Sequence, residues 1–200
     1  MRTLATLGEI KGIRLEKDLQ LIQAIGAGDQ LALRHLYEFH HLMVYNTALS
    51  FTKNQVEAEE VTQDVFLKIY KSASGFDGKS KLSTWIYRIT INTALNQIKA
   101  NKKFSFLQFG NLKDHSAFEH PGVSSDKKEE AKILYQVIES LVINQKTAFI
   151  LSYIEELPRQ EVADIMELSL KAVESLLQRA KKTLREQLKN RYPHRRNYKK

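Results

Sequence analysis

The sequence contains no cysteine, and only eight of its 200 residues are glycine and three are proline. The absence of cysteine excludes disulfide bonds, thiolate nucleophiles and cysteine-ligated zinc or iron–sulfur sites. The scarcity of glycine and proline argues against collagen-like, low-complexity and turn-rich all-β chains. With 42% hydrophobic and 27% charged residues, the composition is that of a folded globular protein.

Long hydrophobic runs are also missing. Nowhere do 18 uncharged apolar residues follow one another, and the first 18 residues contain no apolar core of signal-peptide length. The sequence has no Walker loop, G-x-G-x-x-G or H-E-x-x-H motif. We therefore expect a soluble, cytoplasmic protein without membrane insertion, and no cofactor, metal or catalytic residue is indicated.

Positive charge is concentrated in two zones of a chain whose net charge is +8. Residues 171–200 hold eleven basic and two acidic residues, a net charge of +9, so the remaining 170 residues sum to −1. Residues 78–113 hold seven basic residues and no acid. Two separate cationic zones on a nearly neutral body indicate a polyanion that is contacted at two places. The alternative is a charge that serves solubility alone.

Helical periodicity dominates the sequence, and no alternating strand pattern is present. This predicts an all-α protein with two small helical domains joined by a flexible linker. Helices are expected over residues 17–27, from residue 29 for about 20 residues, over 54–71 and over 83–103. The helical periodicity stops over 104–130, which predicts the linker, and it resumes after residue 130. Asp29, Asn144 and Ser169 are the expected N-caps of helices.

The helix expected from Ser83 has two different faces at 100° per residue. One face is apolar and predicts core packing, with Tyr87, Ile91, Ala94, Leu95 and Ile98. The opposite stripe consists of Trp85, Arg88, Asn92, Asn96, Lys99 and Lys103. An aromatic ring, two amides and three cations suit phosphates and unstacked bases. The alternative is an ordinary solvated face, with Trp85 in the core.

The segment 157–180 has the order short helix, turn and longer capped helix that is typical of a helix-turn-helix motif. The outward residues of the second helix, which would enter the major groove, are Lys171, Glu174, Ser175, Gln178, Lys182 and Arg185. Two features argue against this interpretation: Glu167 occupies a turn position that favours glycine, and Glu174 puts an anion on the reading face. A plain helical hairpin is the alternative.

The helix over 54–71 carries Glu57, Glu60 and Asp64 within a narrow arc. These carboxylates are candidates to bind a divalent metal, to orient DNA by repulsion or to contact a basic protein partner. Acidic residues in a first turn also stabilise a helix by opposing its dipole, which needs no ligand at all.

These segments resemble a known family. The sequence AEEVTQDVFLKIYK at 58–71, followed by Phe76, LSTWIYRI at 82–89 and Asn92, resembles domain 2 of bacterial sigma factors. Residues 157–184, which end in LLQRAKKTL, resemble domain 4. A chain with only these two domains and a short tether is similar to the extracytoplasmic-function (group 4) sigma factors.

The resemblance implies partners and a role for each segment. The 58–71 helix would dock on the β′ clamp helices of core RNA polymerase through Glu60, Gln63, Asp64 and Phe66. The −10 element of promoter DNA would contact Lys79, Lys81, Trp85, Arg88, Asn92, Asn96, Lys99 and Lys103. The six outward residues of the helix-turn-helix would read the −35 element, while domain 4 also contacts the β flap. An anti-sigma factor is a further candidate partner.

The resemblance also implies a division of the chain. Residues 1–16 would form an N-terminal extension, 17–103 domain 2, 104–130 the linker, 131–190 domain 4 and 191–200 a basic tail. Two other functions stay open at this point. One is a stand-alone helix-turn-helix transcription regulator with an N-terminal sensor or dimerisation domain. The other is a metal-dependent nucleic-acid enzyme that uses Glu57, Glu60 and Asp64.

Overall fold

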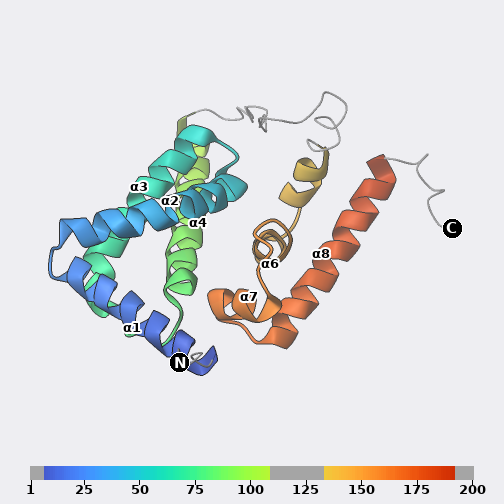
Figure 1. Ribbon diagram of the computed structural model, residues 1–200. Coiled ribbons are helices and arrows are strands. Elements are labelled where there is room, and N and C mark those ends of the chain that lie inside the picture. The colour runs from blue at the N-terminus through green and yellow to red at the C-terminus, as the bar shows by residue number, and fades with distance from the viewer. Residues whose placement is uncertain (1–6, 109–132, 192–200) are drawn as a thin grey trace, which may run out of the picture. The chain divides into compact units, whose positions relative to one another are not determined.

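The computed structural model describes residues 7–108 and 133–191, and every regular element within these ranges is a helix (Figure 1). The all-α prediction is therefore confirmed. The chain divides into two compact units, Met1–Lys113 and Asp114–Lys200. None of the described helices is long and apolar enough to cross a membrane.

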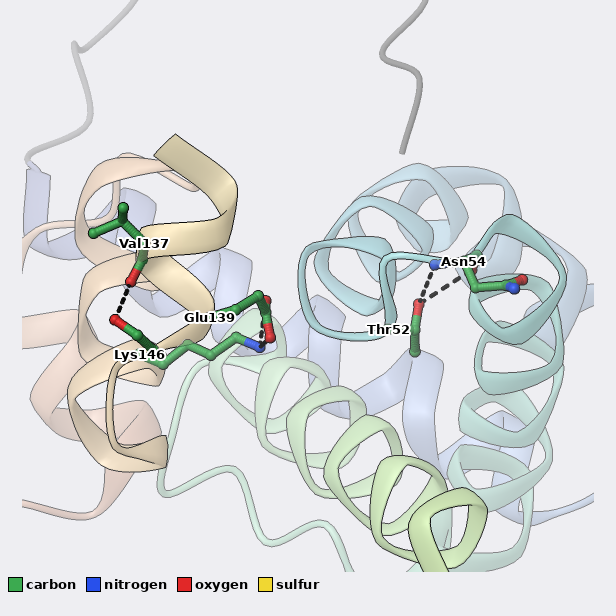
Figure 2. A network of polar contacts seen from close by, with 6 residues as sticks. Thr52, Asn54, Val137, Glu139 and Lys146 are labelled. Carbon is green, nitrogen blue, oxygen red and sulfur yellow. Dashed lines mark hydrogen bonds and ion pairs between the residues drawn. The ribbon is translucent and has the colours of Figure 1, made fainter. Parts of the chain in front are cut away.

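Unit 1 contains α1 (Leu7–Gly26), α2 (Gln30–Thr52), α3 (Gln55–Ser72), the 3-10 turn η1 (Ala73–Gly75) and α4 (Leu82–Gln108). Helices α2, α3 and α4 pack on one another, and α1 packs on α2 and η1. The carboxylate of Asp29 caps α2 by accepting hydrogen bonds from the backbone N–H of Leu31 at 2.8 Å and of Ala32 at 3.1 Å. The turn before α3 is closed by Thr52 Oγ1, which donates to the carbonyl of Asn54 at 3.1 Å (Figure 2).

The core of unit 1 is built from one apolar stripe of each helix. The fully buried side chains include Ile22, Ile25, Leu36, Val44, Val61, Val65, Ile69 and Ile86. Burying such a side chain contributes about 1.5–3 kcal/mol each. Because the buried stripe of a helix determines its rotation, the residues on the opposite stripe must face solvent.

Unit 2 contains a helical segment at 133–139, α6 (Ile143–Tyr153), α7 (Arg159–Met166) and α8 (Leu170–Arg191). Val137, Ile138 and Leu141 form a buried cluster with Ala180 and Leu184 of α8. Helix α7 packs on α8 and on α6, and it buries Val162, Ala163 and Ile165. The small Ala163 is only 1% exposed, as expected for the close contact between the two helices of the motif.

Several boundaries differ from those expected. Helix α1 begins at Leu7 instead of residue 17, and α4 continues to Gln108, five residues into the expected linker. The rest of that linker, 109–130, and the tail from 192 lie outside the described residues. The expectation that Asn144 is an N-cap is wrong, because α6 already begins at Ile143 with Val142 as its N-cap. Leu141 is buried in the core, and this packing determines that the helix begins two residues later. It overrides the preference of Asn144 for the N-cap position.

Unit 2 also buries a charge. Lys146 of α6 is 5% exposed, and its Nζ lies 2.7 Å from Glu139 Oε1, whose side chain is 43% exposed (Figure 2). An ammonium group in this position depends on its partner, since a buried charge without compensation is costly.

We expect Glu139→Gln to destabilise unit 2 by about 1–2 kcal/mol, because the buried ammonium loses its counter-charge. Lys146→Met, which removes the charge and keeps the apolar stem, should stay within about 1 kcal/mol of the wild type. Hydrogen exchange of the α6 and α8 amides in the full chain measures both effects. A larger loss in Lys146→Met than in Glu139→Gln would contradict this account.

Candidate functional site

The outward face of α3 carries three of the four residues expected to bind a partner. Because Val61, Val65 and Ile69 are buried, Glu60, Gln63 and Asp64 face solvent. Phe66 does not lie on this surface: it is 7% exposed, and its ring centroid is 4.8 Å from that of Tyr37 in α2. A direct contact between Phe66 and a partner stays a prediction, and in the free chain its ring packs beneath the surface of α3 against α2.

Sequence reasoning missed three apolar residues on the same face. Val56, Leu67 and Tyr70 are exposed, and helical spacing places them on one stripe with Gln63. Because these residues lie opposite the buried stripe at helical spacing, the sequence alone could have predicted their exposure. We use the term α3 face for Val56, Glu60, Gln63, Asp64, Leu67 and Tyr70. Apolar side chains edged by acids are typical of a surface that binds another protein.

Two of the three acids in the α3 arc are tied to α4. Glu57 Oε1 accepts a hydrogen bond from Asn101 Nδ2 at 2.9 Å, and Glu60 Oε2 accepts one from Gln97 Nε2 at 3.1 Å. Within residues 7–108 and 133–191, no three His, Cys, Asp or Glu side chains form a group that could hold a metal ion. The acids therefore connect two helices and give the surface its charge.

The loop between η1 and α4 has a defined conformation. Phe76 is buried, and its ring lies 5.0 Å from the Trp85 ring at an interplanar angle of 44°. The Asp77 carboxylate accepts hydrogen bonds from both the Nζ and the backbone N–H of Lys79, and these bonds lower the pKa of Asp77. Gly78 has φ +70°, and a Cβ at this position would lie 2.8 Å from Leu19 Cδ2 of α1. The loop is thus held by α1 and α4.

The polar stripe of α4 lies at the surface next to this loop. Asn92, Asn96 and Lys99 are exposed, as are Lys79 and Lys81 before the helix. Trp85 and Arg88 are partly buried, and the side chain of Lys103 lies outside the described residues. On the opposite stripe, Tyr87, Ile91 and Ala94 are buried, which confirms the predicted core face. Leu95 and Ile98 are only partly buried.

Helix α8 presents the second polar stripe. Ser169 caps it, with Oγ accepting from the backbone N–H of Ala172 at 3.2 Å. Val173, Leu177, Ala180 and Leu184 are buried, so the six predicted outward residues lie on the other side. Lys171, Gln178, Lys182 and Arg185 are exposed, whereas Glu174 and Ser175 are partly buried.

Neighbouring side chains engage the two partly buried residues of this stripe. Glu174 Oε1 lies 3.6 Å from Arg159 NH1 of α7, and Ser175 Oγ accepts a hydrogen bond from Arg179 at 2.9 Å. The turn before α8 has Glu167 at φ 56°, the left-handed conformation expected of this glycine-favoured position. Leu168, in the turn between the two helices, is 39% exposed.

Comparison with known protein families identifies both units. The Sigma-70 region 2 model matches residues 36–104, and the Sigma-70 region 4 model matches residues 131–184. The chain belongs to the extracytoplasmic-function sigma factors. It is 27% identical to the ECF RNA polymerase sigma factor SigW of Bacillus subtilis over 84% of this chain and 95% of that protein. It is 28% identical to the RNA polymerase sigma-H factor of Pseudomonas aeruginosa over 84% of this chain and 92% of the relative.

Solved structures share the fold of this sigma factor. CnrH, solved in complex with the cytosolic domain of CnrY, matches with a TM-score of 0.64 and 21% identity over 86% of this chain and 97% of CnrH. The sigma factor RpoE of Bartonella quintana, solved with the anti-sigma factor NepR, matches with a TM-score of 0.63 and 22% identity over 78% of this chain and 96% of RpoE.

The contact between Gly78 and Leu19 generates a test of the loop. We expect Gly78→Ala to displace the loop at a cost of about 1–2 kcal/mol, because the new methyl group meets Leu19 and φ stays positive. Gly75→Ala is the matched control, since no atom lies within 4 Å of its Cβ position and its φ is not positive. Trp85, the only tryptophan, reports the change through its fluorescence. Equal spectra for both variants would contradict a loop held by α1.

Proposed function

We propose that this sigma factor binds core RNA polymerase through the α3 face and directs initiation at promoters by contacting the −10 and −35 elements with separate units. It has no catalytic role and acts in the cytoplasm together with the polymerase. The observation that carries the proposal is the presence, in one chain, of an acidic and apolar protein-binding face and of two basic surfaces suited to DNA.

The α3 face suits a helical partner of mixed charge. Leu67, Val56 and Tyr70 provide apolar surface that is buried when the partner binds. Asp64 and Glu60 provide carboxylates that can pair with basic side chains of the partner. We assign this partner to the β′ clamp helices, as the family resemblance implies. The β flap is the proposed partner of unit 2.

The surface of α4 and its loop suits DNA with separated strands. Asn92 and Asn96 have amides for base edges, and Lys79, Lys81 and Lys99 have cations for phosphates. Trp85 and the stripe residues Arg88 and Lys103 complete the proposed −10 contacts. Because the loop is already held by Phe76 and Asp77, less conformational entropy is lost when DNA binds.

The outward stripe of α8 suits the major groove of duplex DNA at the −35 element. Lys171, Lys182 and Arg185 would contact phosphates or guanine, and Gln178 and Ser175 would contact base edges. Glu174 would accept from a cytosine amine. The two DNA surfaces work together only when polymerase holds both units, since tethered weak sites gain affinity from their effective concentration.

An anti-sigma factor is the proposed inhibitor of this chain. The Bartonella quintana relative was solved in complex with such a factor. A protein that covers the exposed apolar residues of the α3 face would compete directly with the polymerase.

Reversing the charge at the α3 face tests polymerase binding. We expect Asp64→Lys to lower the affinity for core polymerase at least about 30-fold, because a cation replaces an exposed anion that faces a basic partner. Glu186→Lys makes the same charge change at an exposed position of α8 and should bind like the wild type. Affinity is measured by co-purification and by titration of labelled chain with core enzyme. Unchanged binding of Asp64→Lys would contradict the assignment of the α3 face.

Salt dependence tests the division of DNA binding between the two units. We expect the holoenzyme–promoter complex to lose about 10³-fold in affinity between 50 and 200 mM salt, since six or more phosphates are neutralised together. The free chain should show little preference for promoter DNA over a scrambled duplex. Tight and specific binding by the free chain would instead support the stand-alone regulator.

A further inference from the structure

Three side chains of unit 2 that are not among the proposed DNA contacts converge at one side of the helix-turn-helix. Tyr153 ends α6, Arg159 begins α7 and Lys181 lies in α8. Lys181 Nζ lies 4.9 Å from the centroid of the Tyr153 ring. Hydrogen bonding and charge from Lys181, followed by those from Arg159, lower the pKa of the Tyr153 phenol. Lys181 therefore lies over the Tyr153 ring, and the charge of Arg159, from another helix, also acts on the phenol.

This cluster is not part of the core. Tyr153 is 40% exposed, the Arg159 side chain is 54% exposed and Lys181 is exposed. Bringing two cations together on a surface costs free energy through repulsion, and an anion offsets that cost. An ammonium, a guanidinium and a phenol O–H are all donors, which makes the cluster suitable for phosphate oxygens.

The cluster flanks the proposed reading face of α8. Lys181 follows Glu174 by seven residues, so helical periodicity places both on the same edge of the outward stripe. Arg159 lies against this edge, with NH1 3.6 Å from Glu174 Oε1. When a recognition helix enters the major groove, the edges of its reading face lie next to the phosphate backbones that border the groove.

We propose that Tyr153, Arg159 and Lys181 form a binding site for one phosphate of the promoter backbone at the −35 element. Glu174 acts as a positioning residue, which keeps the Arg159 side chain at the groove edge before DNA arrives. At 3.6 Å the ion pair is long for a hydrogen bond, so a phosphate that accepts two N–H bonds can replace it. This inference rests on the proposed function, since it requires α8 to enter the groove.

The test uses holoenzyme assembled from the full chain and core polymerase. The DNA is a promoter fragment recovered by run-off transcription of genomic fragments with the wild type. Single uncharged methylphosphonates replace each phosphate of the −35 region in turn, and the affinity of the wild type and of the variants is measured on every DNA.

We expect a methylphosphonate at one position to lower the DNA affinity of the wild-type holoenzyme about tenfold. The same substitution should lower the affinity of the Arg159→Gln holoenzyme by less than about twofold. Because one phosphate contributes about 0.9 to the slope of log affinity against log salt, Arg159→Gln and Lys181→Gln together should reduce that slope by about 0.9. Tyr153→Phe should bind about fivefold more weakly with an unchanged slope, because it loses a hydrogen bond and no charge. Arg159→Lys should retain the wild-type slope.

Lys189→Gln is the matched control, because it removes one exposed cation of α8 outside the cluster. It should keep the full tenfold loss at the sensitive position. The proposal is overturned if no position shows coupling to Arg159, or if Lys189→Gln abolishes the same loss. If the wild type initiates transcription but no methylphosphonate position is coupled to Arg159, the phosphate site alone is rejected. If the wild type fails to assemble with core polymerase, the proposed function and this site are rejected together.

Discussion

The burial of a single apolar stripe in each helix is the constraint on which the functional surfaces depend. In α3, the buried Val61, Val65 and Ile69 leave Asp64 and its neighbours on the outside. In α8, the buried Val173, Leu177, Ala180 and Leu184 set the direction of the basic outward stripe in the same way. A helix cannot rotate without exposing its apolar side chains, so core packing orients the residues that are proposed to contact polymerase and DNA.

The sequence predicted those features that depend on local periodicity and capping. The helical class, the caps at Asp29 and Ser169, and the buried stripe of α8 follow from spacing that is visible in one chain. Side-chain contacts between different helices were not predictable. Phe66 packs under Tyr37, and Arg159 pairs with Glu174, because the packing of one helix on the next decides which side chains meet, and periodicity within a single helix does not determine that packing. Asn144 shows the same limit, since packing of Leu141 determines where α6 begins.

Preorganisation connects the fold with the proposed mechanism. The loop before α4 is held by a ring contact to Trp85, by the Asp77–Lys79 pair and by close packing of Gly78 on Leu19. The residues before α8 are held by a left-handed Glu167 and by the Ser169 cap. Rigid surfaces lose little entropy on binding, which reduces the free-energy cost of association for each unit. Holding both units together on the polymerase then adds affinity without any new contact.

Run-off transcription on genomic fragments with core polymerase, in the presence and absence of this chain, is the most direct test of the central claim. The account predicts discrete transcript start sites that appear only when the chain is added and that share sequence elements at the −10 and −35 distances. Start sites that are the same with and without the chain, although it has bound to the polymerase, would contradict it.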